Sequence, residues 1–194
     1  MSRQKSEVRK KIIDTTIQMI RKYGDTGMIT VREIASIAGV GVGLINYHFQ
    51  TKENLINLCI MELIGQSVSE LQSFSQNAEM KAIDKLSMLC KGIASFMAIN
   101  EGLSRISITN DLVSPNVNDN IAQLINMLLP IAKEIFGDKK DERELCILLH
   151  MLISSISVGF LRNSVISETF GVDFSDNEQR DNFVEYCIRI VFLN

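Results

Sequence analysis

The 194-residue sequence has few of the residues that interrupt helices. It holds two prolines, eleven glycines and no tryptophan, which leaves little room for long irregular segments or frequent turns. Long runs of alternating apolar and polar residues, the pattern of half-buried strands, are absent. Because 46% of the residues are apolar, the chain can bury a sizeable core, and its composition predicts an all-α fold.

Cysteine and histidine are also scarce, and their placement excludes several kinds of site. The chain has two histidines and no Cys-x-x-Cys pair, which excludes the common zinc spacings. No Ser/His/Asp, Cys/His or paired-carboxylate arrangement can be assembled from these residues. We therefore expect no metal, no cofactor and no enzymatic activity. Buried free thiols are expected at the four cysteines, Cys59, Cys90, Cys146 and Cys187.

A long hydrophobic run occurs at residues 145–161, where one histidine and three serines interrupt it. Its length is short for a membrane span, which needs about 20 residues, so a buried or interface helix is the better interpretation. No basic-then-apolar signal sequence opens the chain. We expect a cytoplasmic protein that makes no contact with a membrane.

Charge is divided unevenly along the sequence. Residues 1–58 carry a net charge of +4 and residues 59–194 a net charge of −7, so the two parts are expected to meet different partners. Five cations, Arg3, Lys5, Arg9, Lys10 and Lys11, crowd the front of the first predicted helix. Cations there oppose the helix dipole unless something anionic lies nearby; the alternative is a solvated, fraying helix end.

Residues 30–49 have the pattern of two short helices joined by a sharp turn. Thr30 and Glu33 have the spacing of a capping box. Two helical turns later comes Gly39, which can adopt left-handed backbone angles without steric cost. A second short helix is predicted over residues 42–49. This pattern predicts a helix-turn-helix, whose second helix can enter the major groove of DNA.

The glycines at positions 39, 41 and 43 raise the alternative of a nucleotide-binding loop. A dinucleotide loop requires Gly-x-Gly-x-x-Gly between a strand and a helix, and a P-loop requires Gly-Lys-Ser/Thr. Counted from Gly39, the sixth position of that pattern is Leu44, and counted from Gly41 it is Asn46, so the required third glycine is missing in both cases. A helical pattern, not a strand, precedes the glycines. The glycines are therefore predicted to bend the chain rather than to bind phosphate.

The order of these motifs resembles the TetR family of bacterial repressors over roughly the first sixty residues. The resemblance rests on Tyr23-Gly24, Thr30 to Ala35, Ala38-Gly39-Val40, Gly43 to Phe49 and Thr51 to Leu55. Family members often have serine where Gly41 stands and tyrosine where Asn46 stands. Glycine is itself a fair N-cap, but Asn46 changes which bases could be read.

The second short helix has a core side and an outward side. Ile45 and Phe49 are predicted to face the core, whereas Asn46 has the donor and acceptor that suit adenine. Tyr47 and His48 suit phosphate oxygens; the alternative is that they pack the domain and that Asn46 caps the helix. The predicted DNA-contacting residues are Thr30, Val31, Arg32, Val42, Gly43, Leu44, Asn46, Tyr47, His48 and Lys52.

Apolar spacing predicts further helices around and beyond this motif. The expected ranges are about 7–23 with a stop at Gly24, 51–74 with Thr51 as N-cap, 80–97, 102–112, 114–136, 141–165 and 176–193. Ser114 with Pro115 is expected to start the helix that Pro130 kinks. Ser175 and Glu178 have the spacing of a second capping box.

The last two predicted helices are apolar over much of their circumference, which is typical of helices shared between subunits or deeply buried in one. The resemblance implies the first: a four-helix dimer interface made by residues 141–165 and 176–193. Ser154, Ser155, Ser157 and Gly159 are small enough for close approach across it. The alternative is an ordinary core helix of a monomer.

The sequence therefore predicts an N-terminal three-helix helix-turn-helix domain (1–52), a linking helix (51–74) and a helical effector-binding and dimerisation domain (75–194). In the family that it resembles, the linking helix couples ligand occupancy to the spacing of the two DNA-binding heads. We expect a dimeric repressor that binds a palindromic operator in double-stranded DNA and is released by a small apolar effector. The alternative is a helical binding module that does not use DNA. Soft apolar side chains expected in the pocket are Met88, Phe96, Met97, Met127 and Met151.

Overall fold

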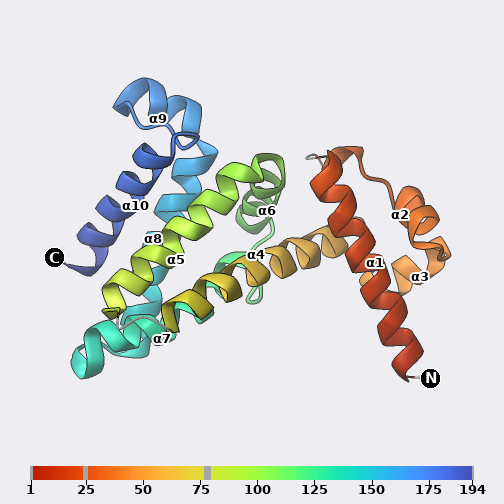
Figure 1. The fold of residues 1–194 in the computed structure, drawn as a ribbon, viewed down its shortest axis with the longest axis horizontal. Coiled ribbons are helices and arrows are strands. Elements are labelled where there is room, and N and C mark those ends of the chain that lie inside the picture. The colour runs from red at the N-terminus through yellow and green to blue at the C-terminus, as the bar shows by residue number, and fades with distance from the viewer. Residues whose placement is uncertain (1, 24–25, 77–79, 194) are drawn as a thin grey trace. The chain divides into compact units, whose positions relative to one another are not determined.

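The computed structural model of the chain is all-α, as the sequence predicts (Figure 1). It describes the backbone of residues 2–23, 26–76 and 80–193, and the side chains of these residues apart from 2–5, 26, 64 and 67–76. The described residues form helices and connecting turns, and no strand occurs among them. The chain divides into two compact units, Met1–Gly65 with Asn100–Ser107, and Gln66–Ile99 with Ile108–Asn194.

The helices follow the chain in an order that keeps the helix-turn-helix at the N-terminal end. The first unit begins with α1 (Ser2–Tyr23), the short 3-10 helix η1 (Thr26–Met28), α2 (Val31–Ala38), α3 (Val42–Phe49) and the start of α4 (Lys52–Gln76). Then come α5 (Ala82–Ile99), α6 (Glu101–Val113), α7 (Asn120–Phe136), η2 (Gly137–Lys139), α8 (Glu142–Leu161), α9 (Asn163–Phe170) and α10 (Asn177–Phe192). Both α4 and α6 have residues in each unit.

The core of the first unit forms where α1 packs against α2 and α3. Ile12, Ile34 and Ile45 are fully buried there. The prediction that Ile37 also faces inward is wrong, because its side chain is 60% exposed. Helix α2 has only two turns, and the buried Ile34, Ala35 and Ala38 already fill its inner face.

The ends of the long helices in this unit differ in how well the sequence predicts them. Helix α1 begins at Ser2, five residues before the predicted start, and the predicted stop at Gly24 lies outside the described residues. Thr51 accepts a hydrogen bond from the backbone N–H of Asn54 at 3.1 Å. This bond is the one that an N-cap side chain makes, so it confirms the predicted role of Thr51.

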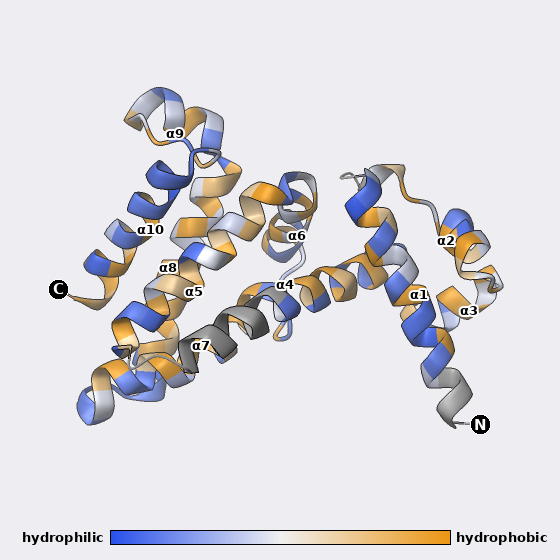
Figure 2. Cartoon of the chain, in the orientation of Figure 1, coloured by the Kyte–Doolittle hydropathy of each residue, from blue (hydrophilic) through white to orange (hydrophobic). Residues whose placement is uncertain are grey.

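The core of the second unit lies among α5, α7, α8 and α10, which pack against one another. Leu86, Leu128, Leu149 and Val184 are fully buried in this unit. Helix α8 is mostly hydrophobic, whereas α10 is hydrophilic in its first half (Figure 2). The prediction that both helices are apolar around most of their surface therefore holds for α8 and only for the second half of α10.

Three predicted helix boundaries in this unit are wrong. Helix α7 is capped by Asp119, whose carboxylate accepts from Ala122 N–H at 2.9 Å; Ser114 instead follows the end of α6 and donates its N–H to Asn110 O. The final helix is capped by Asp176 rather than Ser175. The long helix expected to reach residue 165 ends at Leu161, and α9 begins after Arg162.

The last turn of α6 contains a buried carboxyl group. Asp111 is buried and accepts a hydrogen bond from the side-chain amide of Asn120 at 3.2 Å. Burial, reinforced by the negative charge of Asp119, raises the pKa of Asp111 to about 6. This contact ties the end of α6 to the start of α7 within the second unit.

Gly159 has a different role from the one predicted. It lies in the core of α8, where an added Cβ would meet the ring of Phe174 at 2.8 Å and that of Phe183 at 3.2 Å. Phe174 is itself buried, and its ring centroid lies 5.1 Å from that of Phe183. Gly159 therefore admits an aromatic pair of its own chain. Ser157 is buried as well, so neither residue offers a surface to a second subunit.

Helix α8 is long and apolar enough, by length and composition alone, to cross a membrane. Many core helices of soluble proteins pass the same test, and 44% of its most apolar window is buried inside this structure. The helix packs against α7 and α10. This packing agrees with the predicted buried or interface helix.

Candidate nucleic-acid interface

The turn between α2 and α3 is built by local hydrogen bonds and one left-handed glycine. Thr30 Oγ1 accepts from Glu33 N–H at 3.2 Å, and Thr30 N–H donates to Glu33 Oε2 at 3.0 Å. This confirms the predicted capping box at the start of α2. At its end, Gly39 has φ 63° and ψ 39°, a conformation that costs a non-glycine residue about 1–2 kcal/mol. The glycine thereby ends α2 and turns the chain into α3.

Helix α3 begins without a side-chain cap. Its N-cap, Gly41, has an extended backbone and makes no capping side-chain bond, whereas an added Cβ at this position would meet no atom within 4 Å. The first turn closes through the bond from Leu44 N–H to Gly41 O at 2.9 Å. The missing cap therefore leaves the helix intact.

The two sides of α3 are separated as the sequence predicts. Ile45 is 1% exposed and Phe49 is also buried. On the other side Tyr47 is 65% exposed, and Val42, Leu44 and Asn46 are exposed too. Gly43 has open space around it. One face of α3 thus anchors the helix and the opposite face is available to a partner.

His48 lies between these two faces. It is half-buried, and its ring makes an edge contact with Tyr47, with centroids 5.1 Å apart and an interplanar angle of 79°. Its centroid is 6.0 Å from that of Phe49. The packing alternative for His48 therefore has support, because the ring is held by aromatic neighbours on α3 itself.

The other predicted DNA-contacting residues gather in the same unit, at the start of α2 and of α4. Arg32 is exposed on the first turn of α2, Val31 is half-buried beside it, and Lys52 is half-buried at the first position of α4. Thr30 is exposed, but its hydroxyl also donates to Glu33 Oε2 at 2.9 Å. That hydroxyl is thus already hydrogen-bonded within the capping box that the sequence predicts, and this role competes with a DNA contact.

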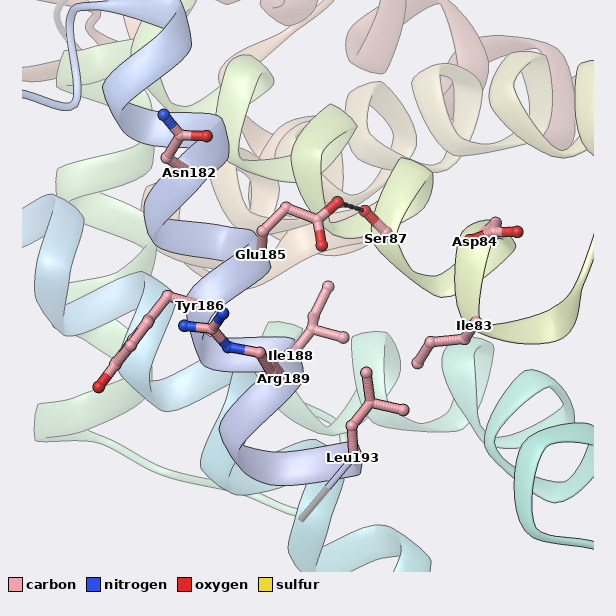
Figure 3. A pocket seen from close by; sticks show the side chains of 9 residues that line it. All are labelled: Ile83, Asp84, Ser87, Asn182, Glu185, Tyr186, Ile188, Arg189 and Leu193. Carbon is pink, nitrogen blue, oxygen red and sulfur yellow. Dashed lines mark hydrogen bonds between the residues drawn. The ribbon is translucent and has the colours of Figure 1, made fainter.

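The second unit contains an open groove of about 400 Å³ between α5 and α10 (Figure 3). Glu185 accepts a hydrogen bond from the Ser87 hydroxyl and pairs with Lys91 at 2.6 Å. These contacts hold the pKa of Glu185 below its usual range. The groove is lined by Ile83, Asp84, Ser87, Asn182, Glu185, Tyr186, Ile188, Arg189 and Leu193.

None of the predicted pocket residues lines this groove. Met97 is buried, and Met88, Phe96 and Met127 are half-buried in the second unit. Met151 lies on the outer side of α8 and is 51% exposed. The predicted effector pocket stays a prediction, and the position of Met151 fits a subunit interface better than an enclosed pocket.

The cysteines are free thiols, as the sequence predicts, but they are not all buried. Burial raises the pKa of Cys59 and of Cys90 to about 12. Cys146 and Cys187 are only half-buried. Within the part of the chain that the structure describes, no group of three or more His, Cys, Asp or Glu side chains could hold a metal ion.

A short helix, a left-handed glycine and a second two-turn helix with an exposed outer face form the arrangement of a helix-turn-helix. The sequence profile of bacterial regulatory proteins of the tetR family matches residues 12–59, which cover α2, α3 and parts of α1 and α4. Over this N-terminal domain the chain is similar to TetR-family regulators.

Solved structures with similar folds extend over nearly the whole chain. FadR of Thermus thermophilus, a TetR-family repressor solved with lauroyl-CoA, is 18% identical with a TM-score of 0.73, covering 94% of this chain and 92% of that one. The fatty acid degradation regulator FadR of Bacillus halodurans is 20% identical with a TM-score of 0.57, covering 94% and 97%. No curated protein matches the chain. At these identities the likeness establishes the fold.

Proposed function

We propose that this regulator is a repressor that binds a palindromic operator as a dimer and is released by a small effector held in the second unit. The exposed face of α3, opposite the buried Ile45 and Phe49, is the observation that carries the proposal. On this face Asn46 offers the donor and acceptor that pair with adenine. The protein would act without catalysis and in the cytoplasm, where bacterial DNA lies.

A dimer is supported by an apolar stripe that the second unit leaves uncovered. Ile147, Met151 and Val158 are exposed along α8, and Tyr186 and Ile190 are exposed on α10. A core helix of a monomer would bury such residues, whereas a two-fold interface places the same stripe of two subunits face to face. A dimer would also supply the two α3 helices that successive major grooves, about 34 Å apart, require.

We expect Asn46→Ala and Lys52→Ala to weaken DNA binding in different ways. Asn46→Ala removes a base contact, so discrimination between operator and random DNA is expected to fall by about 1–3 kcal/mol. Lys52→Ala removes a phosphate contact, so all sequences are expected to bind less tightly, with a salt slope reduced by about 1 per contact. The measurement is fluorescence anisotropy with duplexes selected from a random pool and with unselected duplexes, over a salt series.

Wild-type protein provides the control, because its affinity is expected to fall steeply as salt rises. If the wild-type protein binds no duplex, the alternative of a DNA-independent binding module is correct. If the two variants behave identically, the roles given to Asn46 and Lys52 are wrong.

The effector is proposed to have a substantial apolar part, because the second unit holds adaptable apolar side chains that are only half-buried, among them Met88, Phe96 and Met127. Lauroyl-CoA is the first probe to test, since a protein of similar fold was solved with it. Lauroyl-CoA is expected to release the protein from its selected duplex, whereas coenzyme A alone is expected to leave the complex intact. Release requires the effector to bind the DNA-free state more tightly. Equal effects of the two compounds would contradict an apolar recognition element.

A further inference from the structure

The first eleven residues hold five cations and one acidic residue, Glu7. Three of the cations, Arg9, Lys10 and Lys11, are consecutive, and all three are exposed. Neighbouring like charges repel one another, and the first turn of α1 contains no acidic residue to offset them. The fold therefore keeps an unfavourable concentration of positive charge on this helix.

Two of these side chains lie against the helix-turn-helix. The Arg9 guanidinium lies 5.5 Å from the centroid of the Phe49 ring, at the C-terminal end of α3. Lys11 Nζ lies 3.7 Å from the position that a Cβ on Gly39 would occupy, at the turn that leads into α3. Arg9 and Lys11 thus lie beside the two ends of the predicted reading helix, within one compact unit.

No acidic side chain neutralises these cations in the described part of the chain. The ion pairs of the structure involve other cations, namely Lys85, Lys91, Arg105, Lys133 and Arg180. A helix in the major groove has a phosphate strand on each side. Cations placed beside the two ends of such a helix are therefore within reach of phosphate oxygens, which fix register without reading sequence.

We propose that Arg9, Lys10 and Lys11 form a second phosphate-binding row that extends the DNA contact from α3 and α4 onto α1. This inference rests on the proposed DNA-binding function and adds a set of contacts that the helix-turn-helix pattern does not contain. Because the row contacts only the backbone of the duplex, it raises affinity for all sequences equally. Arg9 has a second role, since its stacking on Phe49 also supports the end of α3.

The test uses the full chain with Lys10→Gln and Lys11→Gln, which leave the Arg9–Phe49 contact in place. The matched control is Lys81→Gln with Lys139→Gln, which removes two exposed cations from the second unit. Binding to a random-sequence 30-base-pair duplex and to a selected duplex is measured by anisotropy over a salt series. The first variant is expected to reduce the slope of log K against log salt by about 2 to 4 for a dimer, equally on both duplexes. The control is expected to retain the wild-type slope.

Each other outcome identifies what has failed. Wild-type protein that binds neither duplex overturns the proposed function itself. Normal wild-type binding, combined with the same slope in both variants, overturns only the phosphate row. A change in preference between the two duplexes would assign Lys10 or Lys11 to base contact and would also overturn the row. Thermal unfolding monitored by circular dichroism verifies that both variants are folded.

Discussion

Met151→Asp is expected to lower the affinity of the protein for its operator by about 10²- to 10⁴-fold, the range that linking two binding modules contributes. Met151 lies in the middle of the exposed apolar stripe of α8, between Ile147 and Val158. In a two-fold interface the stripe meets its own copy, so one substitution places two carboxylates in the same apolar contact. The desolvation of these charges opposes association. Each head then binds its half-site alone.

The measurement combines light scattering after gel filtration with binding to a selected duplex. Val117→Asp is the matched control, because it also replaces an apolar residue that is 87% exposed, on the loop between α6 and α7. The control is expected to remain dimeric and to bind normally. A Met151→Asp protein that is still dimeric would show that the stripe is not the interface. A monomer that keeps full affinity would show that dimerisation does not serve DNA binding.

Phe174→Ala is expected to reduce the free energy of unfolding by about 3–5 kcal/mol, the cost of removing a large buried aromatic side chain. The ring is almost fully buried, lies against Gly159 and packs on Phe183. Its loss would leave a cavity that the rigid helix backbone at Gly159 cannot fill. The backbone carbonyl of Phe174, which accepts from the buried Arg180 at 3.1 Å, is retained in the alanine variant, so the expected loss comes from the ring.

Urea denaturation followed by circular dichroism gives the change in unfolding free energy. Phe170→Ala is the matched control, because that ring is 76% exposed at the end of α9. The control is expected to change stability by less than about 0.5 kcal/mol. Equal losses for the two variants would mean that the contact between Phe174 and Gly159 does not hold the second unit together.

The helix-turn-helix could be read from the sequence because its determinants are local. Thr30 and Glu33 are three residues apart, and the side chain of each accepts a hydrogen bond from the backbone N–H of the other. Gly39 takes left-handed angles that few other residues adopt. The inward and outward faces of α3 follow from helical periodicity alone. No distant part of the chain is needed to specify any of these features.

Choices between neighbouring capping residues depended on contacts from elsewhere in the fold. Ser175 and Asp176 can both begin α10, but the Ser175 hydroxyl donates to Asp173, which also accepts from the Asn163 amide at 3.1 Å. Asp176 is left to accept from Gln179 N–H. The hydrogen bonds of Asn163, which lies fourteen residues before the start of α10, thus help to decide which residue caps the helix.

The sequence by itself determined the all-α class, the helix-turn-helix and which residues of α3 face outward, because periodicity and capping act over a few residues. Only the tertiary structure decided where packing partners come from. It placed Gly159 against Phe174 of the same chain, left Ile37 exposed and brought Arg9 and Lys11 to the two ends of α3. The physical reason is that the local sequence around a small or charged residue is the same whichever distant side chain packs against it. The identity of that neighbour follows from how the helices pack.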